Sequence, residues 1–214
     1  MKYLLLILIV SASLASCAQT KSQEVNIPVG IKKKPAGKES VAFFAEGCFW
    51  HTEIVFQSLA GVRDAVSGYA GGTTKNPDYD EVSSGETGHA ETVQVFYDSS
   101  KISYETLVKA FFASHDPTTL NRQGNDEGTQ YRSIAFYGND KEKQIVEAEI
   151  KQMEVAKKYK DKIVTQIMPI GKFYPAEEYH QEYIYHHPEN PYVQHVSIPD
   201  FVRFTKEFKG DFKQ

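Results

Sequence analysis

Cys48 is the residue of this sequence best suited to nucleophilic chemistry. It lies in Gly47-Cys48-Phe49-Trp50, where an apolar run gives way to a helical pattern, and Cys17 is the only other cysteine. One thiol can form neither an intrachain disulfide nor a structural zinc site by itself. At the start of a helix, backbone N–H groups and the helix dipole favour the thiolate, so we expect a lowered pKa and a reactive sulfur. The alternative is a buried cysteine that acts as a small apolar side chain.

The first 17 residues predict a secretory leader that ends at a lipidation site. Lys2 is basic, residues 3–10 are almost wholly apolar, and Leu14-Ala15-Ser16-Cys17 resembles a bacterial lipobox. The apolar core is too short to cross a bilayer comfortably as a helix. We therefore expect a signal peptide at residues 1–16 and a lipid anchor on Cys17, which would hold the protein in the cell envelope outside the cytoplasm. An ordinary signal peptide with an incidental cysteine is the alternative.

Composition then separates a tether from a globular domain. Residues 17–39 are rich in Gln, Lys, Ser, Pro and Gly, a composition that cannot bury a core and is typical of a flexible linker. Residues 40–214 suit one domain. The formal net charge of −4 gives no indication of nucleic-acid binding, and we expect a monomer.

The domain alternates between strand-like and helix-like patterns. Apolar alternation predicts strands, whereas apolar residues spaced three or four apart, preceded by capping residues such as Ser103 and Asp140, predict helices. Residues 71–90 and 116–129 are expected to be loops, because Gly, Asn, Asp and Thr dominate them. The expected strands are residues 41–45, 62–69, 92–97, 133–137 and 163–167, and the expected helices are 49–59, 103–114, 140–159 and 199–208.

The order of these elements indicates the topology. The first six run strand, helix, strand, strand, helix, strand, which is the order of a split βαβ (ferredoxin-like) plait. We therefore expect an α+β fold in two layers, with an antiparallel or mixed sheet, long loops and a wrapping C-terminal tail. Long loops in a compact domain are usually functional.

Six short motifs follow one another along the chain. They are Gly47-Cys48-Phe49-Trp50, Gly68-Tyr69-Ala70-Gly71-Gly72, Gly88-His89-Ala90-Glu91, Asn121-Arg122-Gln123-Gly124-Asn125-Asp126, Gly128-Thr129-Gln130-Tyr131-Arg132-Ser133 and Tyr179-His180-Gln181. Each is weak evidence by itself, but six in order leave little room for coincidence. Together they resemble the A-type peptide methionine sulfoxide reductases over residues 41–200.

The resemblance implies an oxidoreductase that reduces the S-epimer of methionine sulfoxide, free or in proteins, without a cofactor or metal. Cys48 would attack the sulfoxide sulfur and become a sulfenic acid. Glu91 would donate a proton to the leaving oxygen, because a buried carboxyl has a raised pKa. Asp126 would order the polar network, with His180 as a further member. Without the resemblance, a strand-end salt bridge is the ordinary role for Glu91.

The same resemblance assigns the substrate-binding side chains. Tyr79 and Tyr131 would donate hydrogen bonds to the sulfoxide oxygen. Phe49 and Trp50 would form the walls of an apolar slot for the methyl group, since sulfur packs well against aromatic rings.

One departure from the family pattern concerns regeneration of the thiol. Many relatives have a cysteine shortly after the position of Tyr79, where this chain has Ser83, and others have cysteines near the C-terminus, where residues 188–193 have none. We therefore expect an external thiol, a small molecule or a thioredoxin-like protein, to reduce Cys48 directly.

Three other functions are compatible with parts of the pattern. A thiol peroxidase would also use one cysteine through a sulfenic acid, but would require an arginine beside it. A lipid-anchored binding module for oxidised peptides would not need the thiol at all. A metal site from His180, His186, His187 and His195 has poor support, because neither a cysteine nor tight helical pairing accompanies these residues.

Overall fold

The computed structural model describes residues 39–213. The predicted signal peptide, the lipidation of Cys17 and nearly all of the tether fall on residues 1–38, outside the described residues. Within the described part of the chain, no helix has both the length and the apolar character needed to cross a membrane.

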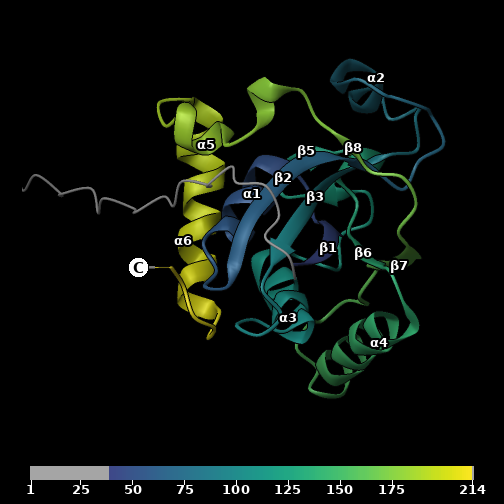
Figure 1. The fold of residues 1–214 in the computed structure, drawn as a ribbon, viewed down its shortest axis with the longest axis vertical. Helices are drawn as coiled ribbons and strands as arrows, with labels where there is room; N and C mark the ends of the chain where they lie inside the picture. The colour runs from purple at the N-terminus through teal and green to yellow at the C-terminus, as the bar shows by residue number, and fades with distance from the viewer. Residues whose placement is uncertain (1–38, 214) are drawn as a thin grey trace, which may run out of the picture.

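A central six-stranded sheet organises the domain (Figure 1). Its strand order is β7-β6-β1-β3-β2-β8, and every neighbouring pair is antiparallel except β6 and β7, which are parallel. The structure is a mixed α/β fold with a mostly antiparallel sheet, in agreement with the predicted combination of helices with an antiparallel or mixed sheet. The strands are β1 (Ser40–Ala45), β2 (Val62–Ala70), β3 (Ala90–Tyr97), β6 (Ile134–Tyr137), β7 (Gln166–Pro169) and β8 (Tyr174–Pro175).

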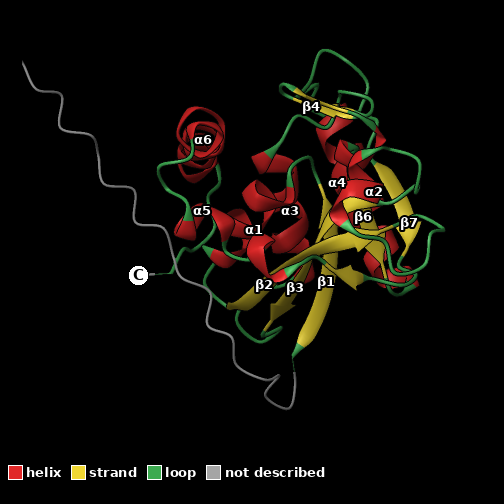
Figure 2. Ribbon diagram, turned by 90° about the horizontal axis from the view of Figure 1, so that it is seen from above, coloured by secondary structure: helices red, strands yellow, loops and turns green. Residues whose placement is uncertain are grey.

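Two helices, α1 (Phe49–Gln57) and α3 (Tyr104–Ser114), cover one face of this sheet (Figure 2). Phe44 of β1 stacks on Phe56 of α1 at 4.9 Å and on Phe111 of α3 at 5.2 Å between ring centroids. All three rings are fully buried, so the main core lies between the sheet and these helices. The helix α6 (Ile198–Glu207) packs against α1 and α3 from outside.

Two expected loops contain short regular elements instead. The helix α2 (Tyr79–Ser83) begins at a capping box, in which Asp78 accepts from the backbone N–H of Glu81 and the Glu81 carboxylate accepts from that of Asp78. The Asp-x-x-Glu spacing is a sequence signal for this cap that the loop prediction overlooked. In the second loop, β4 (Arg122–Gln123) pairs with β5 (Asp126–Glu127), and the 3-10 helix η1 (Thr129–Tyr131) follows.

The limits of α4 and of β7 were also predicted wrongly. Asn139, not Asp140, caps α4 (Asp140–Val155), because its side chain accepts the N–H of Glu142 at 3.0 Å. The helix ends before residue 159, since Lys157 adopts a positive φ of 51°. The strand expected at residues 163–167 is displaced to β7, because β6 pairs with residues from Gln166 onward.

The C-terminal tail wraps back over the first half of the domain, as expected. After β8 pairs with β2, the chain forms the 3-10 helix η2 (Glu178–His180), the helix α5 (Tyr183–His186) and the π-helical segment η3 (Val193–Ser197), which leads into α6. Figure 1 shows this segment running from β8 to α5, which contacts α1.

Candidate active site

Cys48 lies at the junction of β1 and α1, as predicted, and is the N-cap residue of α1. Its carbonyl accepts the N–H groups of His51 and Thr52, and the residue as a whole is partly exposed. Gly47 makes the junction possible. Its φ is +116°, and a Cβ there would lie 2.7 Å from the side chain of Gln123, so both conformation and space require glycine.

The thiol of Cys48 does not have the lowered pKa that its place on the helix predicts. Burial raises its pKa well above the ordinary value, and the negative charges of Glu91 and Asp126 add to the increase. A backbone hydrogen bond at Trp50 and the hydroxyl of Tyr192 lower it by less. Desolvation of the anion therefore outweighs the helix N-terminus, and the resting sulfur is a protonated thiol.

Glu91 lies beside this thiol on β3, opposite Tyr69 of β2. Its side chain is 2 % exposed, and its Oε2 accepts the backbone N–H of Phe49 at 2.9 Å. Burial raises its pKa to about 8, because the Phe49 N–H offsets only part of the desolvation and Asp126 adds a like charge. A neutral carboxyl group is thus available next to Cys48 at neutral pH.

Tyr79 comes from α2 and Tyr131 from η1, two short elements that the sequence analysis did not predict. Burial and the charge of Glu91 raise the pKa of Tyr79 to about 12 and raise the pKa of Tyr131 as well. The charge of Cys48 contributes to the raised pKa of both phenols, which remain protonated donors. Glu177 of the tail fixes the first turn of α2 by accepting the N–H of Tyr79 at 3.0 Å.

The aromatic side chains that follow Cys48 are packed against the tail. The Phe49 ring is 1 % exposed and lies 5.0 Å from the ring of His180. The indole N–H of Trp50 donates to Nδ1 of His180 at 3.1 Å, which leaves the proton of the neutral imidazole on Nε2. Burial lowers the pKa of His180, in agreement with a neutral ring. His180 therefore contacts the aromatic pair rather than the Asp126 side of the site.

Tyr192 is a site residue that sequence reasoning missed. Its hydroxyl donates to Oδ2 of Asp126 and interacts with the Cys48 sulfur, while burial raises its own pKa. Asp126 comes from β5 and Tyr192 from the tail, so only folding brings them to Cys48. No spacing in the sequence distinguishes Tyr192 from the other tyrosines.

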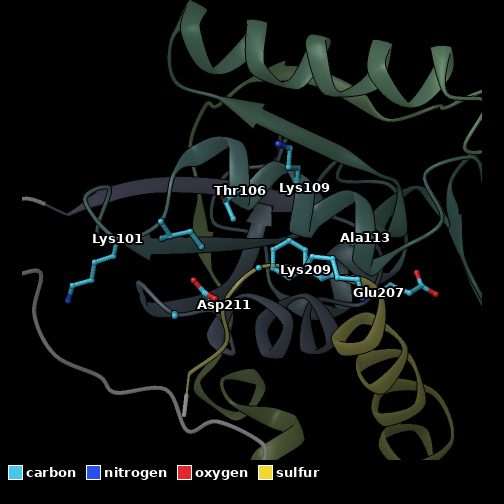
Figure 3. A pocket seen from close by; sticks show the side chains of 11 residues that line it. Lys101, Thr106, Lys109, Ala113, Glu207, Lys209 and Asp211 are labelled. Carbon is cyan, nitrogen blue, oxygen red and sulfur yellow. The ribbon is translucent and has the colours of Figure 1, made fainter.

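One hollow of the domain lies apart from this cluster. Figure 3 shows a pocket of about 450 Å³ between α3 and the residues after α6, lined among others by Lys101, Lys109 and Lys209. It includes none of the predicted site residues. Over residues 39–213, no three His, Cys, Asp or Glu side chains are grouped so that they could hold a metal ion.

The site thus brings a protonated thiol, a neutral carboxyl, phenol groups and aromatic rings together at the start of α1. The family model described as "Peptide methionine sulfoxide reductase" matches residues 40–212. The chain therefore belongs to the peptide methionine sulfoxide reductase family, and the prediction of an enzyme that reduces methionine sulfoxide is confirmed.

Individual relatives agree with this assignment. The chain is 48% identical over 185 residues to peptide methionine sulfoxide reductase MsrA 1 of Rhodopirellula baltica, covering 86% of this chain and 94% of the relative. It is 47% identical to MsrA of Pasteurella multocida, covering 80% and 98% of the two chains. Among solved structures, reduced Mxr1 of Saccharomyces cerevisiae is similar with a TM-score of 0.67 and 39% identity, covering 74% and 91%.

Proposed function

We propose that the enzyme reduces the S-epimer of methionine sulfoxide in peptides and proteins with Cys48 as nucleophile and Glu91 as proton donor. The observation that carries this assignment is the neutral carboxyl of Glu91, held by the N–H of Phe49 at 2.9 Å next to the thiol. Tyr79 and Tyr131 donate to the sulfoxide oxygen, and Phe49 and Trp50 surround the methyl group.

The raised pKa values of Cys48 and Glu91 suit the proton balance of this reaction. A sulfoxide oxygen that leaves as water takes up two protons. Glu91 supplies one, and the thiol supplies the other as its sulfur bonds to the sulfoxide sulfur. Water then attacks the Cys48 sulfur of this sulfonium adduct, which releases methionine, the sulfenic acid and one proton, and the proton returns to Glu91. The methionine sulfur gains the two electrons that Cys48 loses.

Regeneration of Cys48 requires two equivalents of an external thiol. The first forms a mixed disulfide with the sulfenic acid and releases water, and the second reduces that disulfide to the free thiol. Cys48 is the only cysteine among residues 39–213, and Ser83 occupies the end of α2. A thioredoxin-like protein or a small thiol serves as reductant.

A single-turnover experiment tests this half of the cycle. Stoichiometric substrate without reductant should give one methionine per chain and a sulfenic acid that dimedone traps, with no intramolecular disulfide in the mass spectrum. Two methionines per chain when the substrate is in excess, or product without a dimedone adduct, would show a different recycling route.

The proposal also includes a location for the protein, at a membrane of the cell envelope. Leu14-Ala15-Ser16-Cys17 supports lipidation and a role in repair of oxidised proteins in the cell envelope. Cys17→Ala should release the protein from membranes without changing the specific activity of the purified domain.

The strand order β6-β1-β3-β2, with α1 and α3 on one face, supports a split βαβ plait as the core.

Turnover of the two separated methionine sulfoxide epimers tests the proposed reaction. With dithiothreitol as reductant, the enzyme should reduce the S-sulfoxide and leave the R-sulfoxide unchanged, and Cys48→Ser should have no turnover because a hydroxyl is a far weaker nucleophile. Preference for hydrogen peroxide would favour a thiol peroxidase instead. Against that alternative, the charged groups that shift the pKa of Cys48 are the acidic residues Glu91 and Asp126, not an arginine.

A further inference from the structure

Trp50 is held in place by residues 180–183 of the tail, which we call the clip. His180 accepts the indole N–H at 3.1 Å. Tyr183 stacks on the indole with ring centroids 3.7 Å apart and planes 5° from parallel. One face and one edge of the indole are therefore fixed by two residues that are only three apart in the chain.

The two middle residues of the clip anchor it to the domain. Gln181 is bound to both backbone groups of Ser67 on β2, because its Oε1 accepts the Ser67 N–H and its Nε2 donates to the Ser67 carbonyl, each at 3.0 Å. The N–H of Glu182 donates to Oε1 of Glu53 on α1 at 2.9 Å. Ser67 and Gln57 hold the Glu53 carboxyl in turn, with distances of 2.7 Å and 3.0 Å.

The backbone of Glu182 makes this arrangement possible. Its φ of 53° is left-handed, a conformation that costs a non-glycine residue free energy and that surrounding contacts must maintain. The turn lets Gln181 and Glu182 face the domain while His180 and Tyr183, on either side, both reach Trp50. The anchors and the indole contacts thus belong to one four-residue unit.

We propose that Gln181 and Glu53 are positioning residues for the substrate slot, acting through the clip on the orientation of the Trp50 indole. This inference rests on the proposed function, in which Trp50 forms a wall around the sulfoxide methyl group. A loosened clip should weaken binding of the substrate more than it slows the chemistry at Cys48, because within residues 39–213 the hydrogen bonds of Gln181 and Glu53 go to β2, α1 and the tail rather than to the thiol or Glu91.

Intrinsic fluorescence gives a readout that does not depend on turnover. Trp50 is the only tryptophan in the chain, so emission and acrylamide quenching report this indole alone. Gln181→Leu removes the anchoring hydrogen bonds while keeping a side chain of similar size, and Gln152→Ala on the exposed surface of α4 is the matched glutamine control. Glu182→Gly keeps the anchoring N–H and suits the left-handed backbone, so it serves as the conservative variant.

We expect Gln181→Leu to shift Trp50 emission to longer wavelength, to increase quenching several-fold and to raise KM several-fold with a smaller fall in kcat. Glu182→Gly and Gln152→Ala should resemble the wild type in emission.

If Gln181→Leu does not fold, His180→Phe, which removes only the acceptor of the indole N–H, should give the same fluorescence and KM changes. A folded Gln181→Leu or His180→Phe protein with wild-type emission, quenching and KM would overturn the proposal. Should the wild type fail to reduce methionine sulfoxide, the proposed function would fail, while the fluorescence comparison would still decide whether the clip holds the indole.

Discussion

Glu91 and Glu53 are two buried carboxyls in different regions of the domain, and they have the same raised pKa. Each is 2 % exposed, and burial raises the pKa of each to about 8. Glu91 faces Cys48 and accepts one hydrogen bond among the described residues, from the N–H of Phe49. Glu53 lies between α1, β2 and the tail and accepts three, from Ser67, Gln57 and Glu182.

The two carboxyls differ in how much of their hydrogen-bonding capacity is already used. The oxygens of Glu53 accept hydrogen bonds from α1, β2 and the tail, so this carboxyl links three parts of the fold. Glu91 has one fixed bond and lies beside a thiol and two phenols, so its proton can go to a substrate. A perturbed pKa by itself therefore does not identify a catalytic acid; the unused hydrogen-bonding capacity and the neighbouring groups do.

Of the substitutions considered, Glu91→Gln should slow the reaction most and so distinguish Glu91 most clearly from Glu53. An amide keeps the shape and accepts the Phe49 N–H but cannot deliver a proton, and general acid catalysis typically contributes ~10² to 10⁴-fold. The single-turnover rate at pH 8 should fall by that order, with partial recovery at low pH, where solvent supplies protons. An unchanged rate would remove Glu91 from the mechanism.

The pH profile sharpens the assignment of the proton donor. Because the proposed step uses the protons of both Cys48 and Glu91, the single-turnover rate should be level below pH 8 and should fall as pH rises through about 8, the pKa of Glu91. The fall should approach about tenfold per pH unit. A rate that instead rises through this range would mean that a preformed thiolate attacks, which contradicts the proton balance proposed above.

Tyr192→Phe should have a smaller, several-fold effect on the reactivity of the thiol. Its hydroxyl lowers the pKa of Cys48, so its loss should raise that pKa further and leave Asp126 without its phenol donor. Alkylation of Cys48 by iodoacetamide as a function of pH measures the change. Tyr185→Phe, on an exposed tyrosine of the same tail, is the control, and equal alkylation profiles would place Tyr192 outside the site.

Glu53→Gln should change kcat least, by less than about threefold, since a positioning residue acts mainly on binding. Its effect should appear in stability. The folded-state pKa of Glu53 is about 8 against an ordinary 4.5, so the folded chain binds more protons in this window and stability falls as pH rises through it. Urea denaturation at several pH values should show a smaller fall for the variant. A loss of activity as large as that of Glu91→Gln would abolish the contrast between the two carboxyls.

Local patterns were sufficient for the β1–α1 junction that carries Cys48 and for the start of α3. The apolar strand before Gly47 and the helical spacing after Cys48 located the β1–α1 junction, and Ser103 was identified as the cap of α3, where its side chain accepts the N–H of Thr106. They were insufficient where a short element depends on a partner far along the chain. The backbone of Tyr79 in α2 is bound by Glu177 of the tail, and β7 takes its limits from β6.

The sequence by itself determined which residues could react and in what family of proteins such motifs occur, because lone thiols, turn residues and ordered motifs are properties of the linear chain. Only the tertiary structure decided their electrostatic states. The pKa of Cys48 is raised rather than lowered, because desolvation depends on what Glu91, Asp126 and the tail enclose. The same holds for Tyr192 and for the clip on Trp50. Their partners are more than 60 residues away in sequence, and no local spacing encodes a contact that folding alone creates.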